Sequence, residues 1–464
     1  MATMKEKEEI FIRRTKEKYP AVWAHYCEHI AHESMSPEQL KEYNFQKRKE
    51  IVRYAFENTK FYHDLYSSVG FEPNDLKSEK DWNSLPTITK PMVRENFNAM
   101  LVGGESGELV TKHGKVCNTG GSTGIPLKLI EDTRFDMPGS TVWRSRGWWL
   151  GRPRGQLTGD VPVLGQNEAM IWRTKGVNVK TPEQKKAEIA EYWPTRRFYL
   201  DAQDMSDENI MTFIKECQVD GVVFLRGYAG AMVEFAKYCK SLGVTCRPST
   251  VSVVSSPIDA IGRRIISDAL GCNVYDCYGA KECYNMAHEC PRSNHNLHVL
   301  SDLRHIDILD DSGNPVIGES EGVTHITSFT NYIMPMIRYR LGDMAHWAGQ
   351  CDCGLPFPLI SRIRGRETEH LVDKFGRVFF APETPCLLRP NCVEGYQFAQ
   401  HRPGVITIRM ILNKQHPDFE KDFAFIDGFY EENFSGRFDY TYEFVEKIAH
   451  DGGKSRCIVQ EPKI

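Results

Sequence analysis

The sequence of 464 residues has no run of 18 apolar residues, and its first residues, Met1–Glu9, include no apolar stretch like the core of a secretory signal. The first absence argues against a membrane span, and the second argues against export. An excess of one charge is also missing, because 58 Lys and Arg face 62 Asp and Glu, a net charge of −4. Nucleic acids and anionic membranes attract basic surfaces, so neither is expected as the main partner.

Cysteine is abundant by contrast, with 14 residues. Without an export signal, these are expected to be reduced thiols or metal ligands in the cytoplasm, not a disulfide framework. A hydrophobic fraction of 41% and a mean hydropathy of −0.45 fit a soluble chain with a substantial core. The length exceeds one ordinary domain and predicts a large domain plus a smaller one.

Strand-like and helix-like segments alternate through the middle of the chain, which predicts an α/β fold with largely parallel, layered sheets. Ligands of such folds bind at the carboxyl ends of strands, where Ser255 and Tyr278 are expected. A hairpin pattern follows at 303–323. The helices are expected at 38–69, 207–217, 228–242 and 419–434, and the strands at 221–225, 251–254, 404–412 and 439–445.

The pattern changes after Arg366, from which we predict two domains. Residues 1–366 would form the large domain with mixed, layered α/β sheets. Residues 367–464 would form a small, mobile α+β domain of ordinary size for a compact unit.

Between Asn118 and Lys128 the chain contains a glycine- and hydroxyl-rich loop suited to holding phosphate. Glycines let backbone N–H groups approach an anion closely, while hydroxyls and a lysine add donors. Alone, such a cluster is more often an ordinary turn, and it lacks the Gly-Lys-Ser/Thr ending of a Walker loop. The candidate phosphate-binding residues are Thr119, Gly120, Gly121, Ser122, Thr123, Gly124 and Lys128.

Four blocks follow in order: Tyr278-Gly-Ala-Lys-Glu282, Arg338-Tyr-Arg-Leu-Gly-Asp343, Gly365-Arg366 and Gly452-Gly-Lys454. With the glycine-rich loop, they resemble the ordered motifs of the adenylate-forming (ANL) superfamily of acyl-CoA synthetases and peptide-synthetase adenylation domains. The segments Tyr54–Tyr62 and Leu85–Lys90 are similar to the opening of its phenylacetate-CoA ligase branch. The resemblance covers almost the whole chain.

The resemblance implies a role for each block. The loop would hold the β- and γ-phosphates of ATP, and Tyr278 would stack on the adenine, with Gly279 beside it in the same block. Glu282 would bind Mg²⁺, which prefers carboxylate oxygen, and Asp343 would accept hydrogen bonds from the ribose hydroxyls. Ser255, Ser256 and Pro257 would form part of the adenine wall. Arg366 would brace the ribose or phosphate, and Lys454 would reach the reacting groups during adenylation.

Two positions depart from the family pattern. Lys281 stands where Thr or Ser is usual before the magnesium glutamate, and it could contact the α-phosphate, pair with Glu282, or mark altered chemistry. Thr368 replaces the usual Asp or Lys of the hinge, although a hinge needs only residues that tolerate large backbone changes.

A structural zinc site is also predicted, because thiolates and imidazole in a closed tetrahedron are its usual ligands. The expected set is His288, Cys290, Cys351 and Cys353, with Cys283 and His298 as competing choices for the fourth ligand.

From these patterns we expect an ATP- and Mg²⁺-dependent ligase that forms an acyl-adenylate from an aryl or small carboxylic acid and transfers the acyl group to CoA. One alternative transfers the acyl group to a carrier-protein thiol or to an amine. Another is a nucleotide-binding member that has lost catalysis. Related proteins are commonly dimers, so a homodimer is a further expectation.

Overall fold

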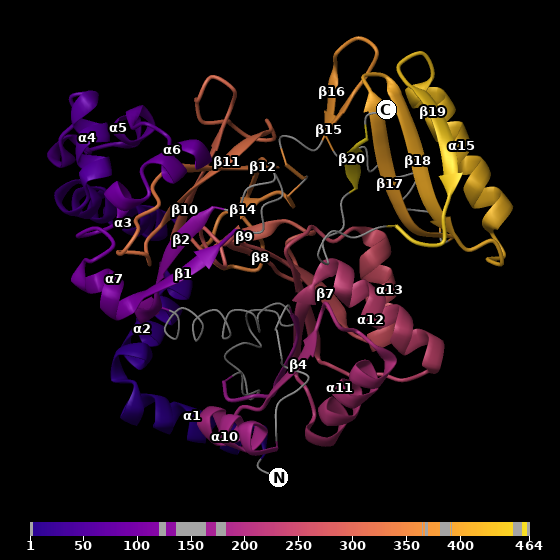
Figure 1. The fold of residues 1–464 in the computed structure, drawn as a ribbon, viewed down its shortest axis with the longest axis horizontal. Coiled ribbons are helices and arrows are strands. Elements are labelled where there is room, and N and C mark those ends of the chain that lie inside the picture. Colours follow the sequence, from indigo (N-terminus) through magenta and orange to yellow (C-terminus); the bar gives the residue numbers. More distant parts are fainter. Residues whose placement is uncertain are drawn as a thin grey trace. The chain divides into compact units, whose positions relative to one another are not determined.

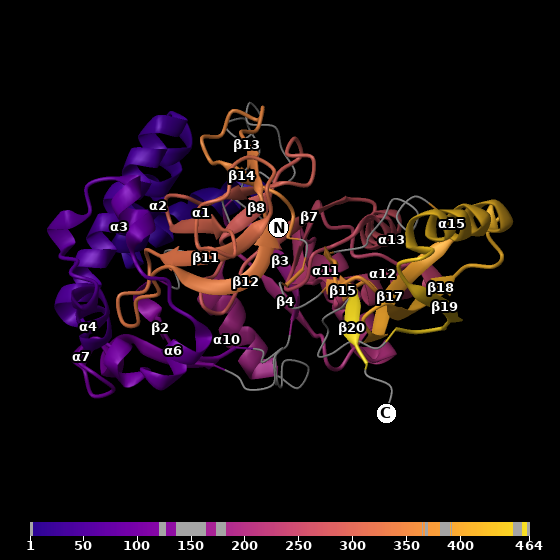
Figure 2. The same cartoon turned by 90° about the horizontal axis from the view of Figure 1, so that it is seen from above.

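The computed structural model describes residues 3–119, 127–135, 164–172, 182–363, 365–366, 370–380, 390, 392–448 and 457–461. Its contacts group the chain into two compact units (Figures 1 and 2). Unit 1 combines residues 1–165 and 277–363, and unit 2 combines 166–276 and 364–464. The predicted C-terminal domain thus lies within unit 2, and its mobility stays a prediction.

The N-terminal helices of unit 1 begin and end at capping residues. Ser36 caps α3 (Pro37–Asn58) through reciprocal hydrogen bonds with Gln39. Thr59 ends α3 and caps α4 (Lys60–Ser68), so the single helix predicted here is two helices. The other helices of this segment are α1 (Met4–Lys18), α2 (Pro20–Ala31), α5 (Glu79–Ser84), α6 (Lys90–Glu95) and α7 (Glu108–His113).

The central sheet of unit 1 is antiparallel, with the order β10-β11-β12. The predicted hairpin is confirmed as β10 (Arg304–Leu309) and β11 (Gly322–Ser328), and β12 (Tyr339–Ala345) continues the sheet. Helix α3 lies beside β10 (Figure 1), where Asn44 Nδ2 donates to the Arg304 carbonyl oxygen at 3.0 Å.

The remaining strands of unit 1 are short. The hairpin β1–β2 flanks the glycine-rich loop, and β8, β9, β14 and β13 pair in that order beside the end of β7. Their bounds are β1 (Gly114–Asn118), β2 (Lys128–Asp132), β7 (Asn273–Tyr278), β8 (Ala287–Glu289), β9 (Leu297–Val299), β13 (Trp347–Gly349) and β14 (Leu359–Ile360).

Unit 2 contains the parallel strands β6-β5-β3-β4, joined by helices as the alternating pattern predicts. The strand predicted at 221–225 is instead β5 (Phe224–Tyr228), because Gly221, with φ of 70°, still ends α11. The other bounds are β3 (Glu168–Trp172), α10 (Pro182–Tyr192), β4 (Arg197–Asp201), α11 (Asp207–Asp220), α12 (Ala229–Leu242), β6 (Thr250–Val254) and α13 (Ala260–Leu270).

The last part of unit 2 is an α+β layer in which α15 (Phe419–Phe434) covers the sheet β19-β18-β17-β20. Ile426, Tyr430 and Phe434 recur every four residues, so one face of α15 is buried with Phe398 of β17. The predicted helix and both strands are confirmed here. The remaining bounds are β15 (His370–Val372), β16 (Val378–Phe380), β17 (Val393–Arg402), β18 (Val405–Leu412), β19 (Asp439–Phe444) and β20 (Ile458–Gln460).

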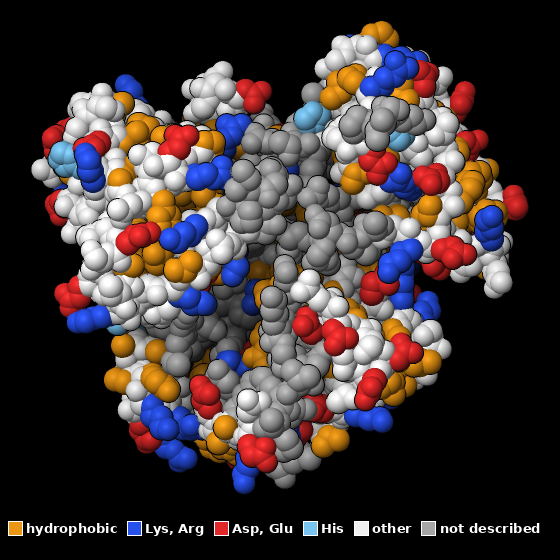
Figure 3. Space-filling view, in the orientation of Figure 1, with side chains coloured by type: hydrophobic (Ala, Val, Ile, Leu, Met, Phe, Trp, Pro, Cys, Tyr) orange, Lys and Arg blue, Asp and Glu red, His pale blue; other side chains and the backbone are white. Residues whose placement is uncertain are grey.

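The α/β architecture with several layered sheets is therefore confirmed. On the face in Figure 3, the described basic and acidic side chains are interspersed. None of the described helices combines the length and apolar character needed to cross a bilayer.

Candidate active site

The glycine-rich loop leaves and re-enters the fold through the hairpin β1–β2. Asn118 pairs with Lys128, and Thr119 closes the base by exchanging hydrogen bonds of 3.0 and 2.9 Å with Leu127. Lys128 Nζ lies 3.2 Å from Glu105 Oε1, so a phosphate would compete with that carboxylate. The predicted phosphate ligands Gly120, Gly121, Ser122, Thr123 and Gly124 lie outside the described residues.

Tyr278 and Asp343, predicted to bind adenine and ribose, are in direct contact. Tyr278 ends β7 and its hydroxyl donates to Asp343 Oδ2 on β12 at 2.8 Å, with Thr324 Oγ1 of β11 at 3.1 Å. Both side chains are buried. The hydroxyl therefore fixes the orientation of the Asp343 carboxylate.

Glu282 is held from the same strand. Tyr339, at the start of β12, donates its hydroxyl to Glu282 Oε1 at 3.3 Å. One strand thus positions both predicted carboxylates, Glu282 for a cation and Asp343 for a sugar. Sequence reasoning missed this role of Tyr339, which lies inside the Arg-Tyr-Arg block.

The loop carrying Glu282 is tightly closed. Ala280 and Cys283 exchange backbone hydrogen bonds of 3.0 and 3.2 Å, and the Met286 N–H donates to the Tyr278 carbonyl oxygen at 2.9 Å. A Cβ on Gly279 would lie 2.9 Å from the backbone nitrogen of Asn285, closer than side chains tolerate. Gly279 is needed for this close approach of backbone segments.

Lys281 points toward β2. Its Nζ lies 2.7 Å from the Tyr284 hydroxyl and 3.8 Å from Glu131 Oε1, and Tyr284 also donates to Glu131. Burial raises the pKa of Glu131, but the Tyr284 and Cys117 hydrogen bonds and two lysines outweigh burial and lower it. Of the three options for Lys281, pairing with Glu282 is replaced by contact with Tyr284 and Glu131, while contact with the α-phosphate and altered chemistry stay predictions. Sequence reasoning missed Glu131, because it lies 150 residues away from Lys281 with no motif of its own.

Sequence comparison finds relatives over most of the chain, although no family model matches. Phenylacetate-coenzyme A ligase of Thermus thermophilus is 23% identical over 390 residues, covering 81% of each chain. The enzyme of the same name from Aromatoleum evansii is 22% identical over 410 residues, 84% of this chain and 87% of the relative.

The fold agrees with that relationship. A crystal structure of 2-hydroxyisobutyryl-CoA ligase in the postadenylation state superposes with a TM-score of 0.72 at 17% identity, covering 93% of this chain and 91% of the other. The chain therefore shares the fold of this ligase and is similar in sequence to phenylacetate-CoA ligases over most of its length.

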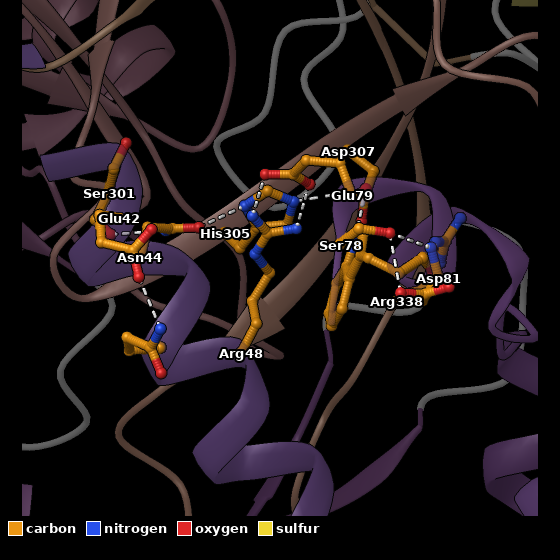
Figure 4. Close-up of polar contacts among 12 residues, drawn as sticks. Glu42, Asn44, Arg48, Ser78, Glu79, Asp81, Ser301, His305, Asp307 and Arg338 are labelled. Carbon is orange, nitrogen blue, oxygen red and sulfur yellow. Dashed lines mark hydrogen bonds and ion pairs between the residues drawn. The ribbon is translucent and has the colours of Figure 1, made fainter. Parts of the chain in front are cut away.

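The other half of the Arg338–Asp343 block is built into the core. Arg338 is 1% exposed and donates to the Trp82 carbonyl oxygen, while the Trp82 indole N–H donates to Asp307 Oδ1 at 2.8 Å. His305 Nε2 lies 3.3 Å from the same oxygen of Asp307. Figure 4 shows the Arg48–Glu79 pair of α3 and α5 close to His305 and Asp307, and the Arg48 guanidinium lies 4.8 Å from the centre of the Trp82 ring. This network holds the N-terminal helices against β10 and β12.

The remaining predicted nucleotide ligands of this family belong to unit 2. Ser255, which precedes Ser256 and Pro257 at the end of β6, has φ of 78°, a costly value for a residue other than glycine. Arg366 follows Gly365, whose φ is 113°. Lys454 and Thr368 lie outside the described residues.

The predicted thiol cluster is assembled, with one correction. Ligand atoms of Cys290, His298, Cys351 and Cys353 all lie within 4.8 Å of one another. His298 Nε2 is 3.3 Å from Cys290 Sγ and 3.5 Å from Cys353 Sγ. Burial lowers the pKa of His298, but Cys290 and Cys351 outweigh it and raise the pKa to about 9.

The choice of His288 as the histidine of this set is wrong, and the competing His298 takes its place. His288 lies opposite His298 on the neighbouring strand β8, with its Nε2 3.6 Å from Cys277 Sγ. Residues two apart on a strand point in parallel about 7 Å apart, so His288 does not converge on Cys290. Cys283, the other competitor, is also outside the set.

Proposed function

We propose that this protein is an ATP-dependent ligase that converts a carboxylic acid, aryl or small acyl, to an acyl-adenylate and transfers the acyl group to CoA. The observation that carries the proposal is the set Tyr278, Glu282 and Asp343, which come from two motif blocks and are positioned by strands β7 and β12. Sequence similarity to phenylacetate-CoA ligases supports the same activity.

The first half-reaction is an in-line displacement at the α-phosphorus of ATP. A carboxylate oxygen of the acid forms a bond to phosphorus, and the bond to the bridging oxygen breaks as pyrophosphate leaves with the electron pair. In the second half-reaction the CoA thiol loses its proton, sulfur bonds to the acyl carbon, and AMP leaves.

Within unit 1, the described residues would bind and orient the nucleotide. Asp343, fixed by Tyr278, would accept hydrogen bonds from the ribose, and the ring of Tyr278 would lie against the adenine. Glu282 offers the carboxylate oxygens that Mg²⁺ prefers, and that ion would offset charge on the departing pyrophosphate.

Ser255, Ser256, Pro257 and Arg366 of unit 2 are proposed as further nucleotide contacts. Lys454 is proposed to stabilise charge that develops only during adenylation, which is the kind of interaction that accelerates a chemical step.

The test is acid-dependent pyrophosphate exchange over a panel of aryl and short-chain acids, followed by product analysis with and without CoA. Exchange with some acid and a thioester only with CoA would support the proposal. Exchange without thioester formation would favour a carrier-protein thiol or an amine as acceptor. ATP binding without exchange across the panel would favour a member that has lost catalysis.

A variant sharpens this test. Lys454→Ala is expected to slow exchange by about 100-fold or more, as for loss of a charge-stabilising donor, while ATP binding stays within a few fold. Lys463→Ala is the matched control. Near-normal exchange by Lys454→Ala would refute the role of Lys454 without touching the ligase proposal.

We further propose that Cys290, His298, Cys351 and Cys353 hold a structural Zn²⁺. Three thiols and one imidazole make a closed donor set of the kind zinc prefers. Purified protein should contain zinc that Cys353→Ser loses together with thermal stability, while Cys27→Ser, at an exposed thiol, keeps both. Metal-free protein of unchanged stability would contradict this proposal.

A further inference from the structure

A second cluster of metal-ligating side chains lies on α2, outside every motif discussed so far. The helix and the residue after it read His25-Tyr-Cys-Glu28-His29-Ile-Ala-His32. Residues three and four apart share one face of a helix, so His25, Glu28 and His29 lie together. Their ligand atoms are within 4.8 Å of one another.

Asp302, in the turn after β9, anchors this face. Its Oδ2 lies 2.7 Å from His29 Nδ1 and 3.2 Å from His32 Nδ1, and its side chain is fully buried. An ionised carboxylate can only accept hydrogen bonds, so both imidazoles must carry their proton on Nδ1. In a neutral His29, the lone pair is then on Nε2.

That arrangement is the one proteins use to prepare a metal-binding histidine. A carboxylate that accepts the N–H of one ring nitrogen fixes the ring and makes the other nitrogen a better ligand. His29 belongs both to the set with His25 and Glu28 and to the set with His32 and Asp302, so it links ligand and anchor.

Charge favours a cation at the same place. Glu28 and Asp302 bring two carboxylates to the imidazoles of His25, His29 and His32, a donor set that suits a divalent ion. The negative field is felt by Tyr43, whose ring lies 4.4 Å from that of His32. Burial raises the pKa of Tyr43, and Glu28 and Asp302 raise it further. Asp302 is buried and Glu28 is exposed, so a metal ion could reach the cluster from the side of Glu28.

We propose that His25, Glu28 and His29 bind a divalent transition metal of the Zn²⁺ class, with Asp302 orienting His29. Three protein ligands of nitrogen and oxygen leave a position for water, unlike the closed thiol cluster. The metal would tie α2 to the segment between His298 and Asp302. Both clusters of unit 1 would therefore fasten the same short piece of chain.

Co²⁺ distinguishes the two sites, because only thiolate ligands give an intense charge-transfer absorption. Untagged protein is stripped with a chelator and titrated with Co²⁺. In the wild type we expect one bound Co²⁺ that adds no thiolate absorption, apart from any Co²⁺ in the thiol cluster. His25→Gln and Glu28→Gln should weaken its binding by more than roughly 100-fold, above the 10–100-fold loss that is usual for outer partners. Asp302→Asn should fall within that outer range.

His63→Gln, at an exposed histidine of α4, is the matched control and should bind as the wild type does. Cys290→Ser should remove only the thiolate band, so the outcome is independent of the zinc proposal above. The inference is overturned if wild-type protein takes up Co²⁺ only with the thiolate band. It is equally overturned if His25→Gln and Glu28→Gln bind the Co²⁺ that gives no thiolate absorption with wild-type affinity. In that case the cluster only forms hydrogen bonds that hold α2 in place.

Discussion

The two ends of the Arg338–Asp343 block have opposite surroundings. Arg338 is enclosed by Trp82 and the Asp307 network, whereas Asp343 meets Tyr278 beside the proposed nucleotide position. A motif read from sequence as one functional block therefore contains a structural end and a binding end. The difference teaches that residues in one motif can have separate consequences when mutated, stability at one end and activity at the other.

Replacing the buried cation should have the largest effect. Arg338→Met removes a buried cation near Asp307 together with its hydrogen bond to the Trp82 carbonyl oxygen, and it should lower the free energy of unfolding by about 3–5 kcal/mol. Urea denaturation measures it. Arg340→Met, at a partly exposed arginine two residues along, is the control and should change unfolding by less than about 1 kcal/mol. Equal effects of the two variants would remove the distinction between the ends.

At the binding end, activity should respond instead. Asp343→Asn should reduce acid-dependent pyrophosphate exchange by about 100- to 1000-fold, the cost of losing one well-placed polar group in an active site. Urea denaturation of the same variant should stay close to wild type. Asp311→Asn, in an exposed turn, should leave exchange unchanged, and a normal rate in Asp343→Asn would disprove the ribose contact.

Lowering the pH should reduce stability through the Asp307 network at the Arg338 end of the block. Burial raises the pKa of Asp307, but His305, Arg338 and the Trp82 indole N–H outweigh it, so the pKa falls well below its usual range. Below about pH 4 the unfolded chain binds a proton that the native chain does not, so stability is lost as pH falls. The loss should be about 2 kcal/mol in the wild type. Denaturation curves against pH should be flatter for Asp307→Asn.

The smallest effect on pyrophosphate exchange is expected from a change at Lys281, which lies outside the Arg338–Asp343 block. Lys281→Thr restores the residue type usual in the family and breaks a partly exposed contact with Tyr284 and Glu131. Such pairs contribute up to about 1 kcal/mol, so exchange should change by no more than about fivefold. Glu282→Gln is the contrasting variant and should lose far more. A large gain of activity in Lys281→Thr would instead support the view that this lysine disables the site.

The fold was largely predictable because its signals are local. Helix 419–434 alternates apolar and polar faces between turn residues, and its bounds agree with α15. The strand near Gly221 was misplaced because that glycine ends a helix and does not begin the strand. Separation of the helix over 38–69 into two depended on the hydrogen-bonding of Thr59, which composition does not reveal.

The candidate site was predictable where family motifs name residues and unpredictable where partners are remote. Tyr278 and Asp343 were expected from their blocks, but the hydroxyl–carboxylate bond between them needs the register of β7 and β12. The choice between His288 and His298 depends on which strand faces Cys290, and spacing along the chain does not encode that. Asp302 is 273 residues from His29, so no local pattern could join them.

The closed loop from Gly279 to Asn285 has an implication for how members of this family diverge. Its shape is set by main-chain bonds and by the missing side chain at Gly279, not by the identity of Ala280 or Lys281. The side chain next to Glu282, the proposed magnesium ligand, can therefore change while the glutamate itself keeps its place. Chemical variety at one position then comes without rebuilding the pocket.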